Sequence, residues 1–284
     1  AAGGLMSPII PPSMLFVIYG VLAQISIGDM FLAGIVPGLM MGASFIATVA
    51  VMGFFYAYPR EQAKSRVDAI RALVGALPSL SIPVVIIGGI AGGIATPTES
   101  AALAAVAAVL VGLLAHGEFK FGRVPKMLIR LVANSSTVLF LVATANVFGW
   151  IIVYEKVPQT LAVQMQLLTE NPFLFMLLLN VLLLLVGTVI DAIAALILVV
   201  PILLPIAQSS YGIDPFHFGV VVCLNLVIGL LTPPVGTALF VAANVSGCKP
   251  AAIMKPLAPF LLCSIAILIL ISWQPVLVTG IIGR

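Results

Sequence analysis

The sequence predicts an all-α polytopic membrane protein, and three observations point to this class. Of the 284 residues, 62% are hydrophobic and only 7% are charged, whereas soluble domains carry about 25% charged residues. Several apolar runs are about 20 residues long, the length of helix that crosses ~30 Å of hydrocarbon. The basic residues are confined to a few connectors. This composition excludes an ordinary cytosolic enzyme, a nucleic-acid-binding protein and a disordered segment.

The apolar runs predict the membrane-embedded segments in chain order. Ten of the twelve Lys and Arg residues lie in three connectors, 58–77, 116–130 and 247–256. The positive-inside rule places these connectors on the cytoplasmic side, which fixes the direction of each crossing and leaves segment 155–170 outside. The predicted runs are 1–25, 29–57, 79–95, 97–115, 133–154, 172–208, 215–246 and 250–274.

Short polar motifs mark helix starts and helix contacts. Thr96-Pro97-Thr98-Glu99 predicts a helix start in which Thr96 is the N-cap and Glu99 closes a capping box. We expect Asn-Ser-Ser-Thr at 134–137 to cap the next helix. The intramembrane amides of Asn146, Asn180 and Asn244 are expected to form hydrogen bonds between helices.

The run 172–208 is too long for one straight crossing. Gly187 and Thr188 lie near its middle, followed by Asp191 and two prolines. Irregular backbone is tolerated at membrane depth only where it is buried in protein or lines a cavity. The run therefore predicts a re-entrant helical hairpin whose tip lies inside the protein.

A Pro-Pro pair followed by Leu-Phe-Val occurs twice, beginning at Pro11 and at Pro233. A further proline, Pro37 or Pro259, follows 26 residues after the first in each copy. The charge pattern gives the two copies opposite directions, and inverted repeats with broken helices are typical of secondary transporters. About 150 residues separate Pro83 from Pro233, whereas ten precede Pro11. We therefore expect a first copy truncated at its N-terminus by roughly 140 residues, which would include a partner hairpin.

Asp191 is the only acidic residue deep within an apolar run. Burial of an uncompensated carboxylate costs several kcal/mol, and no Lys or Arg lies in the neighbouring runs. One interpretation is a cation ligand with Thr188 nearby. The other is an N-cap for the helix that follows, and the two interpretations are compatible.

The segment around Pro233 and Pro234 predicts a broken helix with free oxygens. Proline removes N–H donors and leaves carbonyl groups without helical partners, and Gly229 and Gly236 permit unusual backbone angles. Carbonyl and Thr hydroxyl oxygens suit a hard cation such as Na+. The first copy offers Ser7, Pro8, Pro11, Pro12 and Ser13 at the equivalent positions. A simple kinked transmembrane helix is the alternative.

Several classes of chemistry lack a signature in the sequence. No P-loop motif and no HExxH motif occurs, and Cys223, Cys248 and Cys263 are far apart, as expected for small hydrophobic residues. We therefore expect no enzymatic activity. Energy for transport would come from an ion gradient or from a separate subunit.

Three motifs together resemble the large membrane subunit of TRAP (tripartite ATP-independent periplasmic) transporters, the DctM-like family. They are Gly92-Gly93 with Thr96-Pro97-Thr98-Glu99, Ile10-Pro11-Pro12-Ser13, and Leu231-Thr232-Pro233-Pro234-Val235-Gly236. The resemblance implies an ion transporter superfamily fold with an elevator mechanism in the bacterial inner membrane. It also implies Na+-coupled import of an organic anion, either a carboxylate or a sugar acid. The implied partners are a small four-helix membrane subunit and a periplasmic substrate-binding protein.

The same resemblance implies a domain division. Residues 1–57 and 171–284 would form the moving transport domain, 58–78 a cytoplasmic connector, and 79–170 the scaffold with an arm helix at 155–170. Rival interpretations are a stand-alone Na+/dicarboxylate symporter of the same superfamily, and a channel or non-transporting membrane subunit.

The implied sites lie at the two helix breaks. One Na+ would bind between the second hairpin and the second break, and another at the first break with the missing hairpin. The substrate carboxylate would lie between them. The implied Na+ ligands are Thr188, Asp191, Thr232, Pro233, Gly236, Pro11, Pro12 and Ser13, and the implied substrate residues are Asp191, Ser13, Asn225 and Thr237.

Overall fold

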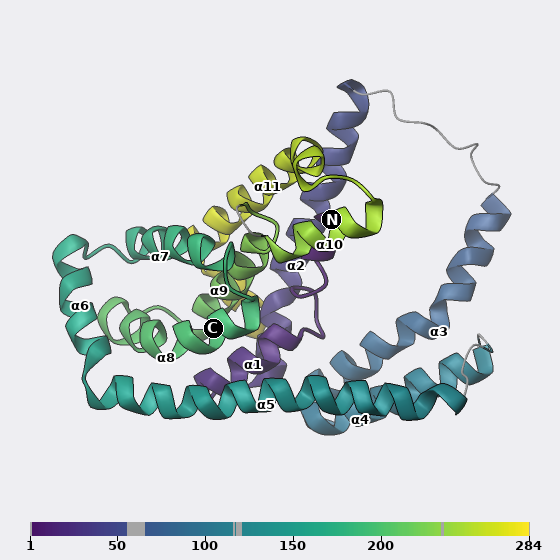
Figure 1. Cartoon of the computed structure of the whole chain (residues 1–284), viewed down its shortest axis with the longest axis horizontal. Coiled ribbons are helices and arrows are strands. Elements are labelled where there is room, and N and C mark those ends of the chain that lie inside the picture. The colour runs from purple at the N-terminus through teal and green to yellow at the C-terminus, as the bar shows by residue number, and fades with distance from the viewer. Residues whose placement is uncertain (1, 56–65, 116, 118–120, 234–235, 284) are drawn as a thin grey trace. The chain divides into compact units, whose positions relative to one another are not determined.

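The computed structural model describes residues 2–55, 66–115, 117, 121–233 and 236–283 (Figure 1). These residues form helices and turns, with no strand among them. Six described spans are long and apolar enough to cross a membrane, or up to seven if the helices Val157–Leu168 and Pro172–Gly187, which meet at a 114° bend, count as one. The main elements are η1 (Ala2–Leu5), α1 (Met14–Ala23), α2 (Ile27–Phe55), α3 (Arg66–Ala91), α4 (Pro97–Leu110), α5 (Val124–Tyr154), α6 (Val157–Leu168), α7 (Pro172–Gly187), α8 (Ala192–Tyr211), α9 (Pro215–Gly229), α10 (Thr237–Ser246), α11 (Pro250–Trp273) and α12 (Val276–Thr279).

The chain divides into two compact units, one of residues 1–51 with 139–284 and one of residues 52–138. The core of the first unit is α9, in which every residue after Pro215 is buried. A helix that is apolar on all sides is stable in a protein only when other elements surround it. Helices α1, α7, α8 and α11 all contact α9 (Figure 1).

Helix α1 approaches α9 closely because Gly219 has no side chain. A Cβ atom at Gly219 would lie 2.1 Å from the ring of Tyr19. The Tyr19 hydroxyl donates to the carbonyl oxygen of Pro215 at 2.5 Å, so the fully buried ring has its polar group satisfied. This contact joins the first proline repeat to the helix that precedes the second.

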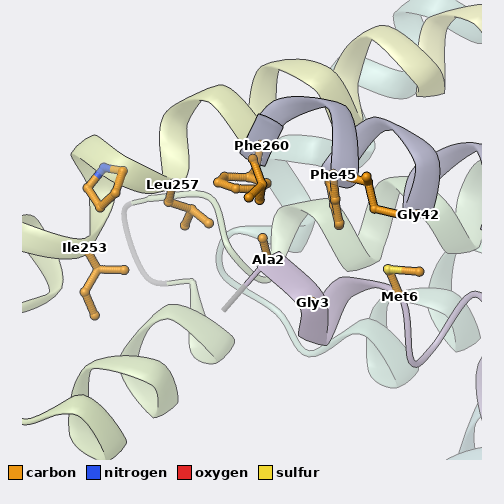
Figure 2. A pocket seen from close by; sticks show the side chains of 11 residues that line it. Ala2, Gly3, Met6, Gly42, Phe45, Ile253, Leu257 and Phe260 are labelled. Carbon is orange, nitrogen blue, oxygen red and sulfur yellow. The ribbon is translucent and has the colours of Figure 1, made fainter. Parts of the chain in front are cut away.

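The second helices of the two repeats, α2 and α11, also contact each other. The rings of Phe45 and Phe260 meet edge to face with centroids 5.6 Å apart, and the Thr48 hydroxyl lies 3.2 Å from the sulfur of Cys263. An apolar pocket of about 670 Å³ lies beside this contact, and Figure 2 shows that Met6 faces it as well. The two repeats therefore pack on one another within the first unit.

The second unit contains the contact between α3 and α4. The Thr96 N–H donates to Glu99 Oε2 at 2.8 Å, and the Glu99 N–H donates to Thr96 Oγ1 at 3.3 Å. The predicted capping box is thus confirmed. In this way α4 begins with Pro97 directly after the glycine turn that ends α3.

Two predicted helix boundaries are wrong. Helix α3 begins at Arg66 inside the predicted connector, and α5 runs unbroken from Val124 to Tyr154. Residues 134–137 therefore lie within a helix and do not cap one. The Thr137 hydroxyl donates to the carbonyl oxygen of Ala133 at 2.9 Å, a bond that lets threonine sit in a helix interior. Connector residues 58–65, 116 and 118–120 lie outside the described residues.

The three intramembrane amides behave differently from one another. The Asn180 side-chain amide on α7 donates to Ser272 Oγ on α11 at 2.9 Å, which confirms the predicted interhelical bond. For Asn146 the prediction is wrong, because its amide donates to Val142 O in its own helix at 3.1 Å. Asn244 is exposed on α10.

Candidate functional site

The predicted hairpin 172–208 consists of two helices with a break between them. Helix α7 ends at Gly187, α8 begins at Ala192, and residues 188–191 form the non-helical tip. The helix–break–helix pattern predicted from Gly187, Thr188 and Asp191 is therefore confirmed, and α8 continues to Tyr211.

The end of α7, directly before the hairpin tip, packs against the end of α9 at two glycines. A Cβ atom at Gly229 would lie 2.7 Å from the Cα of Gly187, and one at Gly187 would lie 3.2 Å from the Cα of Gly229. Both close atoms belong to the backbone, so no side-chain rotation can make room. Gly229 thus serves close packing within a helix, whereas the sequence suggested that it serves an unusual backbone angle.

A backbone hydrogen bond joins the tip to the second helix break. The Gly236 N–H donates to the carbonyl oxygen of Thr188 at 3.1 Å. Gly236 has φ +44°, in the left-handed region that favours glycine, as the sequence predicted. The Thr188 side chain is buried, and its hydroxyl donates to Leu185 O at 2.8 Å.

The second break itself is confirmed. Helix α9 ends at Gly229 and α10 begins at Thr237. The freed carbonyl oxygen of Leu230 accepts from the N–H of Ala238 at 3.1 Å, and the Thr232 hydroxyl donates to Ile228 O at 2.9 Å. Pro233 is exposed, and residues 234 and 235 lie outside the described part of the chain.

The first copy is also non-helical around its proline pair. After η1 the chain is not helical again until Met14, two residues past Pro12. Ser13 is the N-cap of α1: its hydroxyl oxygen accepts from the Phe16 N–H at 3.4 Å and donates to the carbonyl oxygen of Pro8. Pro11 and Ser13 are both buried.

Asp191 lies where the two repeats meet. It is exposed, as are Val189 and Ile190, so the prediction that the hairpin tip is buried inside the protein is wrong for these three residues. Its Oδ1 accepts from the Ile193 N–H at 3.0 Å, so it caps α8 as one interpretation predicted. The same side chain lines a cavity of about 380 Å³. The other described residues lining this cavity are Ser7, Pro8, Pro12, Met14 and Leu15 of the first copy, with Ala192, Ile193 and Leu230.

The other three residues assigned to the substrate, Ser13, Asn225 and Thr237, do not line this cavity. Asn225 is fully buried in α9, where its amide donates to Asn180 Oδ1 at 2.9 Å and to Asn180 O at 3.0 Å. Its own Oδ1 has no hydrogen-bond partner among the described residues. Thr237 is exposed in the first turn of α10.

Sequence reasoning missed the residues that form the apolar walls of the cavity. Met14, Leu15 and Leu230 carry no chemical signal of their own, and only their position next to the breaks could have drawn attention to them. The described residues contain no group of three His, Cys, Asp or Glu side chains that could hold a metal ion.

These features define a multi-pass helical membrane protein whose helices are interrupted near two Pro-Pro pairs and between α7 and α8. The chain belongs to the family described as "Tripartite ATP-independent periplasmic transporter, DctM component", which matches residues 1–277. The resemblance to TRAP large subunits that the motifs indicated is thereby confirmed.

Named relatives agree with this family. The chain is 39% identical over 282 residues to the isethionate TRAP transporter permease protein DctMQ of Oleidesulfovibrio alaskensis, covering 97% of this chain and 43% of that protein. It is 39% identical over 279 residues to the sialic acid TRAP transporter large permease protein SiaM of Vibrio cholerae, covering 97% and 64%. It is 36% identical over 278 residues to the 2,3-diketo-L-gulonate TRAP transporter large permease protein YiaN of Escherichia coli, covering 98% and 65%. The chain thus spans less than two thirds of the length of these relatives, which are named as permeases and not as enzymes.

Proposed function

We propose that this chain is part of the large permease subunit of a Na+-coupled TRAP transporter that imports an organic anion across the bacterial inner membrane. The observation that carries the proposal is the cavity at Asp191, because both helix breaks and the hairpin tip contribute to its surroundings. A site at the junction of two repeats is where secondary transporters with broken helices bind their substrates.

The proposed Na+ sites use oxygens at the two breaks. The bond between Gly236 and Thr188 supports the first site, because it holds the hairpin tip against the segment that contains Thr232. The hydroxyls of Thr188 and Thr232 donate within their own turns, which leaves their oxygen lone pairs available to a cation. Pro11, Pro12 and Ser13 would contribute to the second site.

Coupling would follow from the charge of the cavity. No Lys or Arg is among its described lining residues, and Asp191 is the one acidic residue there. An organic anion in this cavity needs positive charge, since an unpaired ion away from water is costly. Bound Na+ and the nearby helix N-termini would supply that charge. We therefore expect substrate to bind weakly when choline replaces Na+.

The proposal includes the partners and the movement implied by the family. A periplasmic protein would deliver the anion, a small four-helix membrane subunit would brace the scaffold, and residues 1–57 with 171–284 would move as an elevator. The rival is a symporter that needs no binding protein. A channel or non-transporting subunit is a second rival, and it would show no stoichiometric Na+-dependent flux.

Uptake of a panel of organic acids into proteoliposomes tests the proposal. The Na+ gradient, the small subunit and the binding protein are omitted one at a time. We expect uptake to stop when any of the three is omitted. Full uptake without the binding protein would favour the stand-alone symporter, and full uptake without Na+ would contradict the proposed coupling.

Thr232→Val tests the first Na+ site with an isosteric change. The variant removes a hydroxyl oxygen from the break but leaves the volume unchanged. We expect the Na+ concentration for half-maximal uptake to rise about tenfold, as is typical when a group near a bound metal is lost. The loss of one local hydrogen bond should cost only about 1 kcal/mol of stability.

Thr144→Val is the matched control for this variant. Its hydroxyl makes the same kind of bond to the preceding turn, to Phe140 O at 3.1 Å, but it lies on the exposed face of α5. Equal Na+ dependence in the Thr232 and Thr144 variants would remove Thr232 from the site.

A further inference from the structure

Three basic residues share one side of the helix at the start of α5. Arg123 is the last residue of the short helix η3 (Phe121–Arg123), and Lys126 and Arg130 follow on α5. Their spacings of three and four residues place the three side chains on the same side, and all three are exposed. The sequence contains no acidic residue between Glu118 and Glu155. Arg123, Lys126 and Arg130 therefore form a basic face.

The other sides of the same segment carry apolar side chains. Met127, Leu128, Ile129 and Leu131 are all exposed. A helix that is basic on one face and apolar on the others is typical of a membrane interface, where Lys and Arg meet the headgroups and the apolar side chains meet hydrocarbon. The start of α5 therefore has the composition of an interfacial segment.

The length of the span sets the depth of the basic face. Phe121–Tyr154 is a span of 34 residues, longer than the roughly 20 residues that cross the hydrocarbon. Near its other end Trp150 and Tyr154 are exposed and their rings are stacked, and these residue types mark a membrane–water interface. Arg130 lies 20 residues before Trp150, which is about 30 Å of helix and matches the hydrocarbon thickness. The basic face therefore lies at the level of the opposite headgroups.

The basic face also lies at the end of α5 where positive charge is unfavourable. The N-terminus of a helix carries a positive partial charge, so cations near it destabilise the helix and anions stabilise it. Helix α5 has no acidic residue in its first turn. An anionic group bound beside Arg123 and Lys126 would offset both the side-chain charges and the helix dipole.

We propose that the basic face of α5 binds the headgroups of acidic phospholipids in the cytoplasmic leaflet. Basic residues next to a transmembrane segment attract anionic lipids, and the charge pattern places connector 116–130 on the cytoplasmic side. The guanidinium groups of Arg123 and Arg130 can each donate two hydrogen bonds to a phosphate, and Lys126 adds a third positive charge between them. This lipid site does not depend on the proposed Na+ coupling or on the substrate.

Thermal-shift titrations of the purified permease in neutral detergent test the proposal. The probes are dioleoylphosphatidylglycerol, dioleoylphosphatidylcholine and the soluble phosphate sn-glycerol 3-phosphate. We expect phosphatidylglycerol to raise the melting temperature more than phosphatidylcholine, and the soluble phosphate to have no effect. Each basic residue near an anionic surface strengthens binding about fivefold. The combined variant Arg123→Gln/Lys126→Gln/Arg130→Gln should therefore weaken phosphatidylglycerol about 100-fold, and Arg130→Gln alone should weaken it about fivefold.

The other two basic connectors provide a matched control. Arg71→Gln/Lys249→Gln/Lys255→Gln removes the same amount of charge from exposed positions on α3, before α11 and on α11, and it should bind phosphatidylglycerol like the wild type. Arg123→Lys/Arg130→Lys keeps the charge and should retain most of the binding.

Three results would overturn the lipid site. The first is a wild-type protein that phosphatidylglycerol stabilises no more than phosphatidylcholine. The second is equal weakening of phosphatidylglycerol binding in the α5 variants and in the matched control. The third is a soluble phosphate as effective as the lipid, which would show that the basic face binds phosphate without a bilayer. Arg130→Gln, which changes one exposed side chain, gives the second comparison if the combined variant does not fold.

Discussion

Asp191→Ala is expected to abolish Na+-driven uptake while the protein still inserts into the membrane. Removal of a group that only orients a metal ligand costs about 10- to 100-fold in affinity, so loss of a direct carboxylate ligand should cost at least about 100-fold. The readouts are the initial rate of uptake as a function of Na+ concentration and the amount of protein in the membrane.

The two roles of Asp191 can be separated by a second substitution. Its Oδ1 caps α8 through the Ile193 N–H, and asparagine caps a helix about as well as aspartate. Asp191→Asn should therefore keep the melting temperature near the wild-type value and still lose Na+ dependence. Asp191→Ala should also lose about 1 kcal/mol of stability, because alanine cannot cap the helix.

Asp214 provides a control that shares only the capping role. It caps α9 through bonds to the N–H groups of Phe216 at 2.8 Å and His217 at 3.2 Å, and it does not line the cavity. Asp214→Ala should lower stability and leave the Na+ concentration for half-maximal uptake unchanged. Full uptake by Asp191→Ala would overturn the assignment of this residue to the site.

Local chemistry explains which parts of the fold the sequence could predict. Both breaks follow from the proline pairs, because a proline ring clashes with the preceding turn of a helix. The start of α4 follows from the capping box formed by Thr96 and Glu99, three residues apart. Proline alone was not a sufficient signal, since Pro37 and Pro259 lie inside continuous helices. The repeated pairs at Pro11 and Pro233 carried the prediction because they recur with the same spacing.

Long-range contacts explain what the sequence could not predict. Nothing near Asn225 in the sequence indicates that Asn180, 45 residues away, meets its amide. The sequence also does not indicate that Gly187 packs against Gly229. A glycine inside an apolar run shows only that a side chain is absent, and not which backbone lies next to it. The start of α5 was missed because polar residues 134–137 suggested a cap, whereas at Thr137 the hydroxyl bonds to its own helix.

Gly229→Ala is expected to displace the backbone where the end of α7 meets the end of α9. The new Cβ would lie 2.7 Å from the Cα and 2.8 Å from the carbonyl carbon of Gly187, so backbone must move. Overpacking of a core typically costs about 1–3 kcal/mol. Displacement of the tip should also break the bond between Thr188 and Gly236, and we expect both the melting temperature and Na+-driven uptake to fall.

An added Cβ atom would lie at different distances from neighbouring backbone at the two glycines, so the two variants should differ in effect. At Gly187 the nearest atoms would be 3.2 Å from the added Cβ, so Gly187→Ala should be milder than Gly229→Ala in both readouts. Gly75→Ala is the control, because nothing lies within 4 Å of a Cβ there and alanine in a helix interior is favoured over glycine by about 0.5–1 kcal/mol. If Gly229→Ala matched this control in stability and in uptake, the hairpin tip would not be held against the broken helix, and the cation site proposed between them would lose its structural basis.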